Sequence, residues 1–254
     1  DMDWLSAHLS KDEDVQIKSL TNDQTIIVIA GPKARDVLSR AARGDWSSEV
    51  FPWLSVREAF IGFAPATVLG VSFSGELAYE IHVPNAQLYA AYLALRAAGK
   101  AHGLRLFGSR AVESMRLEKG YLHWKSDILT EFDPYETGLD RFVSTKKTDY
   151  IGAAALAERA ANGPSRKLVT LEVACNTAPA HGGASVMQGD RVVGTVASGD
   201  WGHRVGKNLA LAFLLPDLAG LGSTVDIDIL GERYRATVIA PGPYDPDNTR
   251  VKGA

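Results

Sequence analysis

Several features that would narrow the function directly are scarce or missing in this 254-residue sequence. Its one cysteine, Cys175, excludes an internal disulfide and a Cys-x-x-Cys pair for zinc or redox chemistry. No apolar run approaches the roughly 20 residues that span a bilayer. The start, Asp1–Leu5, lacks the basic and apolar segments of a signal peptide. We therefore expect a protein of the bacterial cytoplasm, or of the mitochondrial matrix if the source is eukaryotic.

The common catalytic and nucleotide-binding motifs are also missing. The sequence has no GxGxxG after a strand, no GxxxxGK[ST] loop, no HExxH and no GxSxG. Its six histidines are scattered rather than set at the spacing of metal ligands. We therefore expect no bound metal, and we expect a function that depends on ligand binding rather than on one of these catalytic motifs.

What is present is an ordinary globular composition, with 46% hydrophobic and 22% charged residues. The formal net charge is −3 and both signs are dispersed along the chain. Because the chain has no basic stripe that could contact a phosphate backbone, we do not expect it to bind nucleic acid.

The first part of the chain mixes strands and helices. Thr25–Ala30 predicts a buried strand, and Thr67–Phe73 with Leu77–Val83 predicts a β-hairpin or one sharply bent strand. In the second arm of the hairpin, alternation puts Tyr79 and Ile81 on one face and Glu80 and His82 on the other. Helices are predicted over Lys33–Arg43, Asn85–Ala98 (with Asn85 as N-cap) and Phe107–Lys119, and a loop over Asp133–Gly138.

The pattern changes after a small, polar segment, Ala160–Arg166, which predicts a linker. Short β-like runs without a long helix then indicate a small antiparallel barrel. These runs are Lys167–Val173, Arg191–Ala197, Leu209–Leu214, Thr224–Leu230 and Tyr234–Ile239. We expect an α+β domain over residues 1–160 and a β-barrel domain over residues 161–254.

Three segments, in order, resemble the aminomethyltransferase family, which includes the glycine-cleavage T-protein. Phe73–Ile81 (FSGELAYEI) is similar to the family's aromatic-Thr-Gly-Glu-x-Gly-aromatic-Glu signature. Ser114–Trp124 (SMRLEKGYLHW), followed by Asp127-Ile128, resembles the end of a helix and the loop after it, in the form found in dimethylglycine and sarcosine dehydrogenases. Asp133–Gly152 and, in the predicted barrel, Gly194–Gly199 and Tyr244–Pro246 complete the resemblance.

The resemblance implies folate-binding subdomains, incomplete at the N-terminus, followed by the barrel. It implies one-carbon transfer from an amine to tetrahydrofolate, with 5,10-methylenetetrahydrofolate as product. An FAD-dependent oxidase or dehydrogenase domain or subunit is the implied partner. The family's catalytic aspartate would lie upstream of Asp1, so we expect no catalytic residue within the chain. The alternatives are a folate-dependent O- or S-demethylase and a non-catalytic folate-binding or structural domain.

The resemblance assigns folate contacts to three side chains. Glu80 would accept the adjacent N–H and amino group of the pterin in a planar two-point pair; the alternative is an exposed strand glutamate. Phe73 would pack near the folate or within the core. Trp124 would stack on the pterin or close the core.

Other polar residues of these motifs are expected to be structural. Arg116 and Glu118 are predicted to form an ion pair or to cap their helix, Asp127 to cap a turn, and Glu76 to be a turn residue. Two family arginines are replaced, because Gly70 and Val112 occupy their positions. Their loss would weaken the grip on folate.

Overall fold

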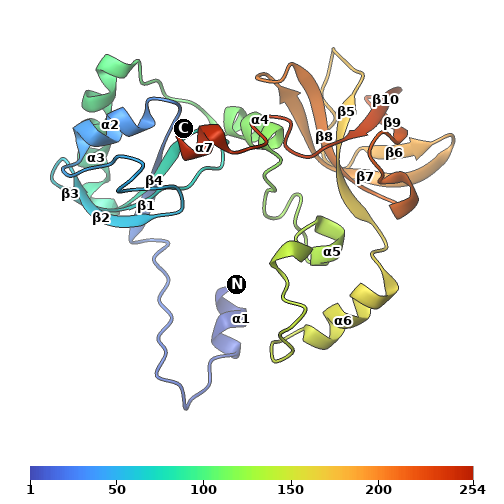
Figure 1. Cartoon of the computed structure of the whole chain (residues 1–254), viewed down its shortest axis with the longest axis horizontal. Coiled ribbons are helices and arrows are strands. Elements are labelled where there is room, and N and C mark those ends of the chain that lie inside the picture. Colours follow the sequence, from blue (N-terminus) through green and yellow to red (C-terminus); the bar gives the residue numbers. More distant parts are fainter. Residues whose placement is uncertain (254) are drawn as a thin grey trace. The chain divides into compact units, whose positions relative to one another are not determined.

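The computed structural model describes residues 1–253, which divide into two compact units. Unit 1 contains residues 1–72, 76–106 and 249–253, and unit 2 contains residues 73–75 and 107–248. Figure 1 shows the elements of both units along the chain.

Unit 1 is built on a four-stranded antiparallel sheet with strand order β1-β4-β3-β2. The strands are β1 (Gln24–Ala30), β2 (Val56–Ile61), β3 (Ala64–Leu69) and β4 (Ala78–Pro84). The helices are α1 (Met2–Ala7), α2 (Ala34–Ala41), α3 (Leu88–Gly99) and α7 (Thr249–Lys252), with 3-10 turns at Asn85–Gln87 and Lys100–His102.

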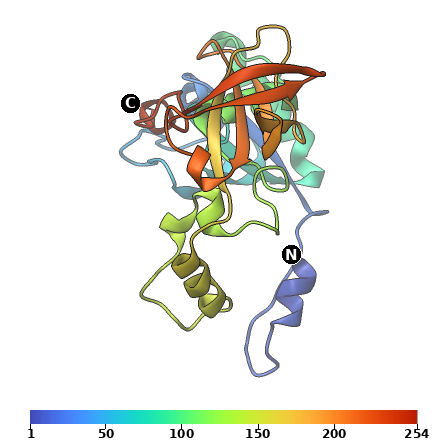
Figure 2. The same ribbon diagram turned by 90° about the vertical axis from the view of Figure 1, so that its right-hand side faces the viewer.

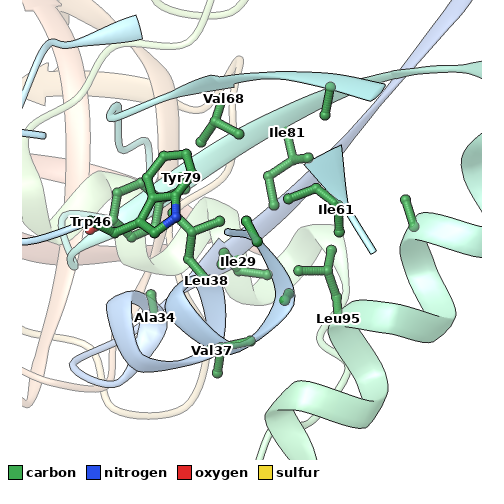
Figure 3. Close-up of a cluster of buried hydrophobic side chains, with 14 of the residues drawn as sticks. Ile29, Ala34, Val37, Leu38, Trp46, Ile61, Val68, Tyr79, Ile81 and Leu95 are labelled. Carbon is green, nitrogen blue, oxygen red and sulfur yellow. The ribbon is translucent and has the colours of Figure 1, made fainter. Parts of the chain in front are cut away.

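One face of this sheet and the helices α2 and α3 enclose the core of unit 1. Figure 3 shows Leu38 of α2 and Leu95 of α3 in one cluster with Ile81 and Ile61 of the sheet. The alternation predicted for β4 is confirmed, because Tyr79, Ile81 and Val83 are buried. Side chains alternate between the two faces of a strand, so β-branched and aromatic residues at every second position all lie on the buried face.

Unit 2 ends in a closed barrel of six antiparallel strands in the order β10-β5-β8-β7-β6-β9, visible from yellow to red in Figure 2. The strands are β5 (Lys167–Val173), β6 (Ser185–Gln188), β7 (Arg191–Gly202), β8 (Lys207–Leu214), β9 (Thr224–Ile229) and β10 (Glu232–Ile239). The predicted barrel is confirmed, and β6 is a strand that sequence patterning missed.

Before the barrel, unit 2 contains α4 (Ser109–Lys119), α5 (Pro134–Thr137), α6 (Ala153–Asn162) and a 3-10 turn at Asp140–Phe142. A second 3-10 turn, at Pro216–Leu218, connects β8 and β9. α4 ends where predicted, because Gly120 takes a positive φ of 71° and its N–H bonds to the last turn. α6 was not predicted, and it covers the first part of the expected linker.

Two local predictions were wrong. Asp133–Gly138 is not a loop: Asp133 and Glu136 form a capping box around α5. Asn85 does not cap a helix, because its side chain contacts Thr25 and the carbonyl of Asn22 while a 3-10 turn precedes α3.

Within residues 1–253, no helix has the length and hydropathy that a membrane-spanning helix needs. In the same residues, no group of three or more histidine, cysteine or acidic side chains is arranged to hold a metal ion.

Candidate functional site

The sheet of unit 1 has a second face, opposite to the one that α2 and α3 cover. Because side chains alternate along each strand, the residues next to the buried ones point to this face. Strand β4 contributes Glu80 and His82 there, and β1 contributes Ile26 and Val28, which are both exposed. The predicted hairpin of β3 and β4 is confirmed by the pairing of Thr67 with His82.

Glu80 lies in a row of apolar side chains on this face. The strand register places it directly opposite Val28 of β1 on one side and Leu69 of β3 on the other, and Leu69 in turn faces Val56 of β2. Directly opposite residues have Cβ atoms about 4.5–5.5 Å apart. A carboxylate with 32% of its side chain exposed therefore lies between apolar neighbours on this face of the sheet.

His82 is the polar neighbour of Glu80 on the same strand. Its Nε2 lies 3.4 Å from Oε2 of Glu80, and 25% of the His82 side chain is exposed. The hydroxyl of Thr67, opposite His82, donates to Glu58 of β2 at 2.7 Å. The face thus combines an accessible carboxylate, an imidazole and apolar surface, which is a chemistry suited to a flat ligand with paired N–H donors.

The other two predicted folate contacts, Phe73 and Trp124, belong to unit 2. The Phe73 ring is partly buried and lies 6.2 Å from the His123 ring, measured between centroids. Trp124 follows α4 and is 52% exposed, so it does not close the core of its unit. The structure brings Glu80 together with His82, and Phe73 with His123, and the assignment of folate contacts stays a prediction.

The buried carboxylate of Asp127 holds the loop that contains Trp124. Asp127 accepts hydrogen bonds from the Arg116 guanidinium at 2.5 Å, from the backbone N–H of His123 at 2.8 Å and from the Ser198 hydroxyl at 2.6 Å. Lys125, next to Trp124, has a φ of 69°, which is unusual outside glycine. Asp127 therefore does more than cap a turn: it joins α4, this loop and strand β7.

Arg116 and Glu118 take part in structural ion pairs, as predicted, but not with each other. Arg116 pairs with Asp127 and, at 2.8 Å, with Glu113. Glu118 is fully buried and pairs with Arg204 at 2.5 Å. Residues two apart on a helix point in different directions, so each finds its partner in a different part of unit 2.

Sequence reasoning also missed polar contacts made by the end of the chain. The Arg204 guanidinium lies 3.7 Å from the centre of the Tyr244 ring, and Lys119 pairs with Asp245 at 3.2 Å. Burial, with the Asp245 carboxylate as the second cause, raises the pKa of Tyr121. No local pattern predicts these pairings, because the partners lie far apart along the sequence.

Gly70 and Val112, which replace the two family arginines, lie in different surroundings. The N–H of Gly70 donates to Ser55 and its carbonyl accepts from Leu54. A Cβ at Gly70 would lie 3.3 Å from the carbonyl oxygen of Pro52, so this position has little room for a side chain. Val112 lies in the first turn of α4 and is partly buried.

Comparison with known proteins agrees with this architecture. Residues 1–147 match the family described as GCVT N-terminal domain, and residues 166–245 match the glycine cleavage T-protein C-terminal barrel domain. The crystal structure of glycine cleavage system aminomethyltransferase T from Bartonella henselae has a similar fold, with a TM-score of 0.67. That match covers 89% of this chain and 85% of that chain at 18% sequence identity, so it supports the fold alone.

Relatives of two kinds align with nearly the whole chain. Mitochondrial dimethylglycine dehydrogenase of Homo sapiens is 33% identical over 241 residues, which cover 94% of this chain and 28% of that protein. Aminomethyltransferase of Bacillus licheniformis is 30% identical over 240 residues, which cover 94% of this chain and 65% of that protein. The chain thus spans less than two thirds of each relative. Since the first family match alone covers more than half of it, the chain belongs to the glycine-cleavage T-protein family of aminomethyltransferases.

Proposed function

We propose that this chain is the folate-binding module of a tetrahydrofolate-dependent one-carbon transferase, as in dimethylglycine or sarcosine dehydrogenase. The one-carbon unit is the methylene group of an amine, presented to the folate as an iminium. One nitrogen of tetrahydrofolate adds to the iminium carbon, and the C=N electron pair passes to the amine nitrogen. The second folate nitrogen then displaces the amine and closes the ring. The two folate N–H protons leave with the amine, and 5,10-methylenetetrahydrofolate is formed. Family membership and the setting of Glu80 support this proposal.

The observation that carries the proposal is a partly exposed carboxylate on an apolar sheet face. A reduced pterin offers a ring N–H and an exocyclic amino group side by side, and a carboxylate accepts both. The apolar side chains of Val28 and Leu69, opposite Glu80, fit the flat faces of such a ring. Glu80 would hold the pterin, while Phe73 and Trp124 are proposed as further folate contacts.

The amine-derived one-carbon unit needs a source. We propose an FAD-dependent dehydrogenase or oxidase domain or subunit, because oxidation of a methylated amine yields an iminium. The human relative is named a dehydrogenase and mitochondrial. We propose the mitochondrial matrix or the bacterial cytoplasm as the location of this chain.

Calorimetric titration with 5-formyltetrahydrofolate, a reduced folate with an intact pterin donor pair, tests the proposal. Glu80→Gln should weaken binding by about ten- to a hundredfold, because a hydrogen bond to a charged group is worth about 1.5–3 kcal/mol. Glu58→Gln is the matched control, since Glu58 lies on the same face but bonds to Thr67. Equal affinity of Glu80→Gln and wild type, or an equal loss in both variants, would contradict the role of Glu80.

Gly70 and Val112 favour a second candidate, a domain that binds folate without transferring the one-carbon unit. Both stand where the resemblance places arginines, and the tight contact at Gly70 leaves little room for a side chain there. The same titration, followed by an assay for 5,10-methylenetetrahydrofolate with an iminium donor, separates the two. Binding without any acceleration of product formation would favour the second candidate. An O- or S-methyl donor in place of the amine would identify a demethylase.

A further inference from the structure

Among the described strand residues of this face, His82 is the polar neighbour of Glu80 on the same strand, and the proposed reaction does not use it. Both side chains come from β4, two residues apart, and point to the same face of the sheet. The distance of 3.4 Å between Nε2 and Oε2 is at the outer limit of a hydrogen bond. Both are partly buried, so a ligand on this face would meet them together.

A two-point pair with a ligand requires a fixed carboxylate plane. The last torsion of a glutamate side chain is broad, so the plane is not set by the side chain itself. Each carboxylate oxygen can accept more than one hydrogen bond. An N–H that donates to Oε2 from within the sheet can therefore fix the plane and leave acceptor sites for the ligand.

The residues on the neighbouring strands do not donate a hydrogen bond to the Glu80 carboxylate in the described part of the chain, whereas His82 is within reach of its Oε2. The residues opposite His82 are Ile26 on β1, which is apolar, and Thr67 on β3, whose hydroxyl donates to Glu58. On the strands flanking β4, the residues opposite Glu80 are Val28 and Leu69. Among the described strand residues of this face, the titratable groups are thus Glu80, His82 and, across Thr67, Glu58.

We propose that His82 is the positioning residue for Glu80, donating from Nε2 to Oε2 and so fixing the plane of the carboxylate that binds the folate. The proposal rests on the proposed function. The 3.4 Å contact leaves Oε1 and a second acceptor site of Oε2 for the paired N–H donors of the pterin. Loss of the donor at position 82 should therefore weaken folate binding, and a different N–H donor there should restore it.

The test is calorimetric titration of the full chain with 5-formyltetrahydrofolate at pH 8. His82→Phe removes the donor and should weaken binding by about two- to tenfold. His82→Gln keeps an N–H donor, so it should bind within about twofold of wild type. Glu58→Gln should bind like wild type, because Glu58 bonds to Thr67. Thermal unfolding of each variant confirms that it is folded.

The outcomes separate this inference from the proposed function. If wild type binds folate and Glu80→Gln does not, the proposed function stands, whatever the His82 variants do. Unchanged affinity in His82→Phe then overturns the positioning role alone. A loss in His82→Gln as large as in His82→Phe would show a steric role instead. A folded wild-type chain that binds no folate overturns both proposals.

Discussion

At the scale of single residues, burial separates two kinds of charged group in this chain. Glu80 and His82 are partly exposed and retain hydrogen-bonding capacity toward a ligand. Arg116, Glu118 and Asp127 are buried, and each forms an ion pair: Arg116 with Asp127, and Glu118 with Arg204. The first kind is available for recognition, whereas the second holds unit 2 in one arrangement and is costly to disturb.

Asp127 is the residue where this cost should be largest. Asp127→Asn keeps the size of the side chain but leaves the Arg116 guanidinium buried beside a neutral group. Removing one partner of a buried ion pair costs about 3–5 kcal/mol. We expect the midpoint of urea unfolding to fall accordingly, with no compensation from Glu113, whose side chain is 39% exposed.

Glu113→Gln provides the matched comparison, because it removes the other carboxylate that pairs with Arg116. Solvent screens the Glu113 carboxylate, which is 39% exposed, so this variant should lose clearly less stability than Asp127→Asn. Similar losses in Asp127→Asn and Glu113→Gln would refute the distinction between the fully buried and the partly exposed carboxylate.

Sequence reasoning reached the first kind of residue and missed the second for a physical reason. The period of two along Leu77–Val83 predicted that Glu80 and His82 lie on one face, and the structure agrees. The pairing of Glu118 with Arg204 joins residues 86 positions apart. No local period encodes such a contact, because it depends on how α4 packs against the barrel of its unit.

At the scale of elements, the misses fall into two groups. The helix α5 had a readable signal, since Asp133-Pro134-x-Glu136 combines an N-cap, a proline at the first helical position and a capping glutamate. The helix α6 and the strand β6 had little signal. α6 is rich in alanine and buries no residue, and β6 has only four residues, so neither has the stripe of large apolar side chains typical of a core element.

The capping box of α5 gives a prediction about pH. Burial raises the pKa of Glu136, but hydrogen bonds from the Ser165 hydroxyl and from the backbone of Asp133 and Arg166 outweigh it and hold this pKa below its usual value. A carboxyl whose pKa is lower in the folded state stabilises the fold above its unfolded pKa, about 4.3. That contribution is lost as the pH falls through the folded value.

Ser165→Ala removes the 2.6 Å hydrogen bond to Oε1 of Glu136, so the pKa of Glu136 should rise. We expect the variant to be less stable than wild type at pH 7, with a difference that shrinks as the pH falls below about 4. Urea unfolding from pH 7 to 3 measures this. Ser144→Ala, whose hydroxyl accepts only from the exposed Lys147 backbone among the described residues, should show no such trend. A difference independent of pH would contradict the assignment to Glu136.

At the scale of the whole molecule, sequence and structure divide the chain by different properties. The change from mixed elements to short strands puts the predicted boundary at residue 160. The structure groups residues 107–248 with the barrel. In this group, Leu117 of α4 packs with Leu209 and Leu211 of β8, away from the main barrel cluster. The boundary at 160 stays a prediction, and these contacts allow it to be tested.

Two fragments ending at Asn248 make that test. The fragment from Phe107 keeps α4, with Leu117 packed on β8 and the pair of Glu118 with Arg204. The fragment from Ala161 exposes the apolar surface that Leu117 covers. Losing one buried leucine from a core costs about 2–5 kcal/mol, so the shorter fragment should unfold at clearly lower urea concentration. If both unfold at the same concentration, the barrel is independent of α4 and a boundary at residue 160 is supported. If the shorter fragment does not fold while the longer does, the folding unit begins before α4.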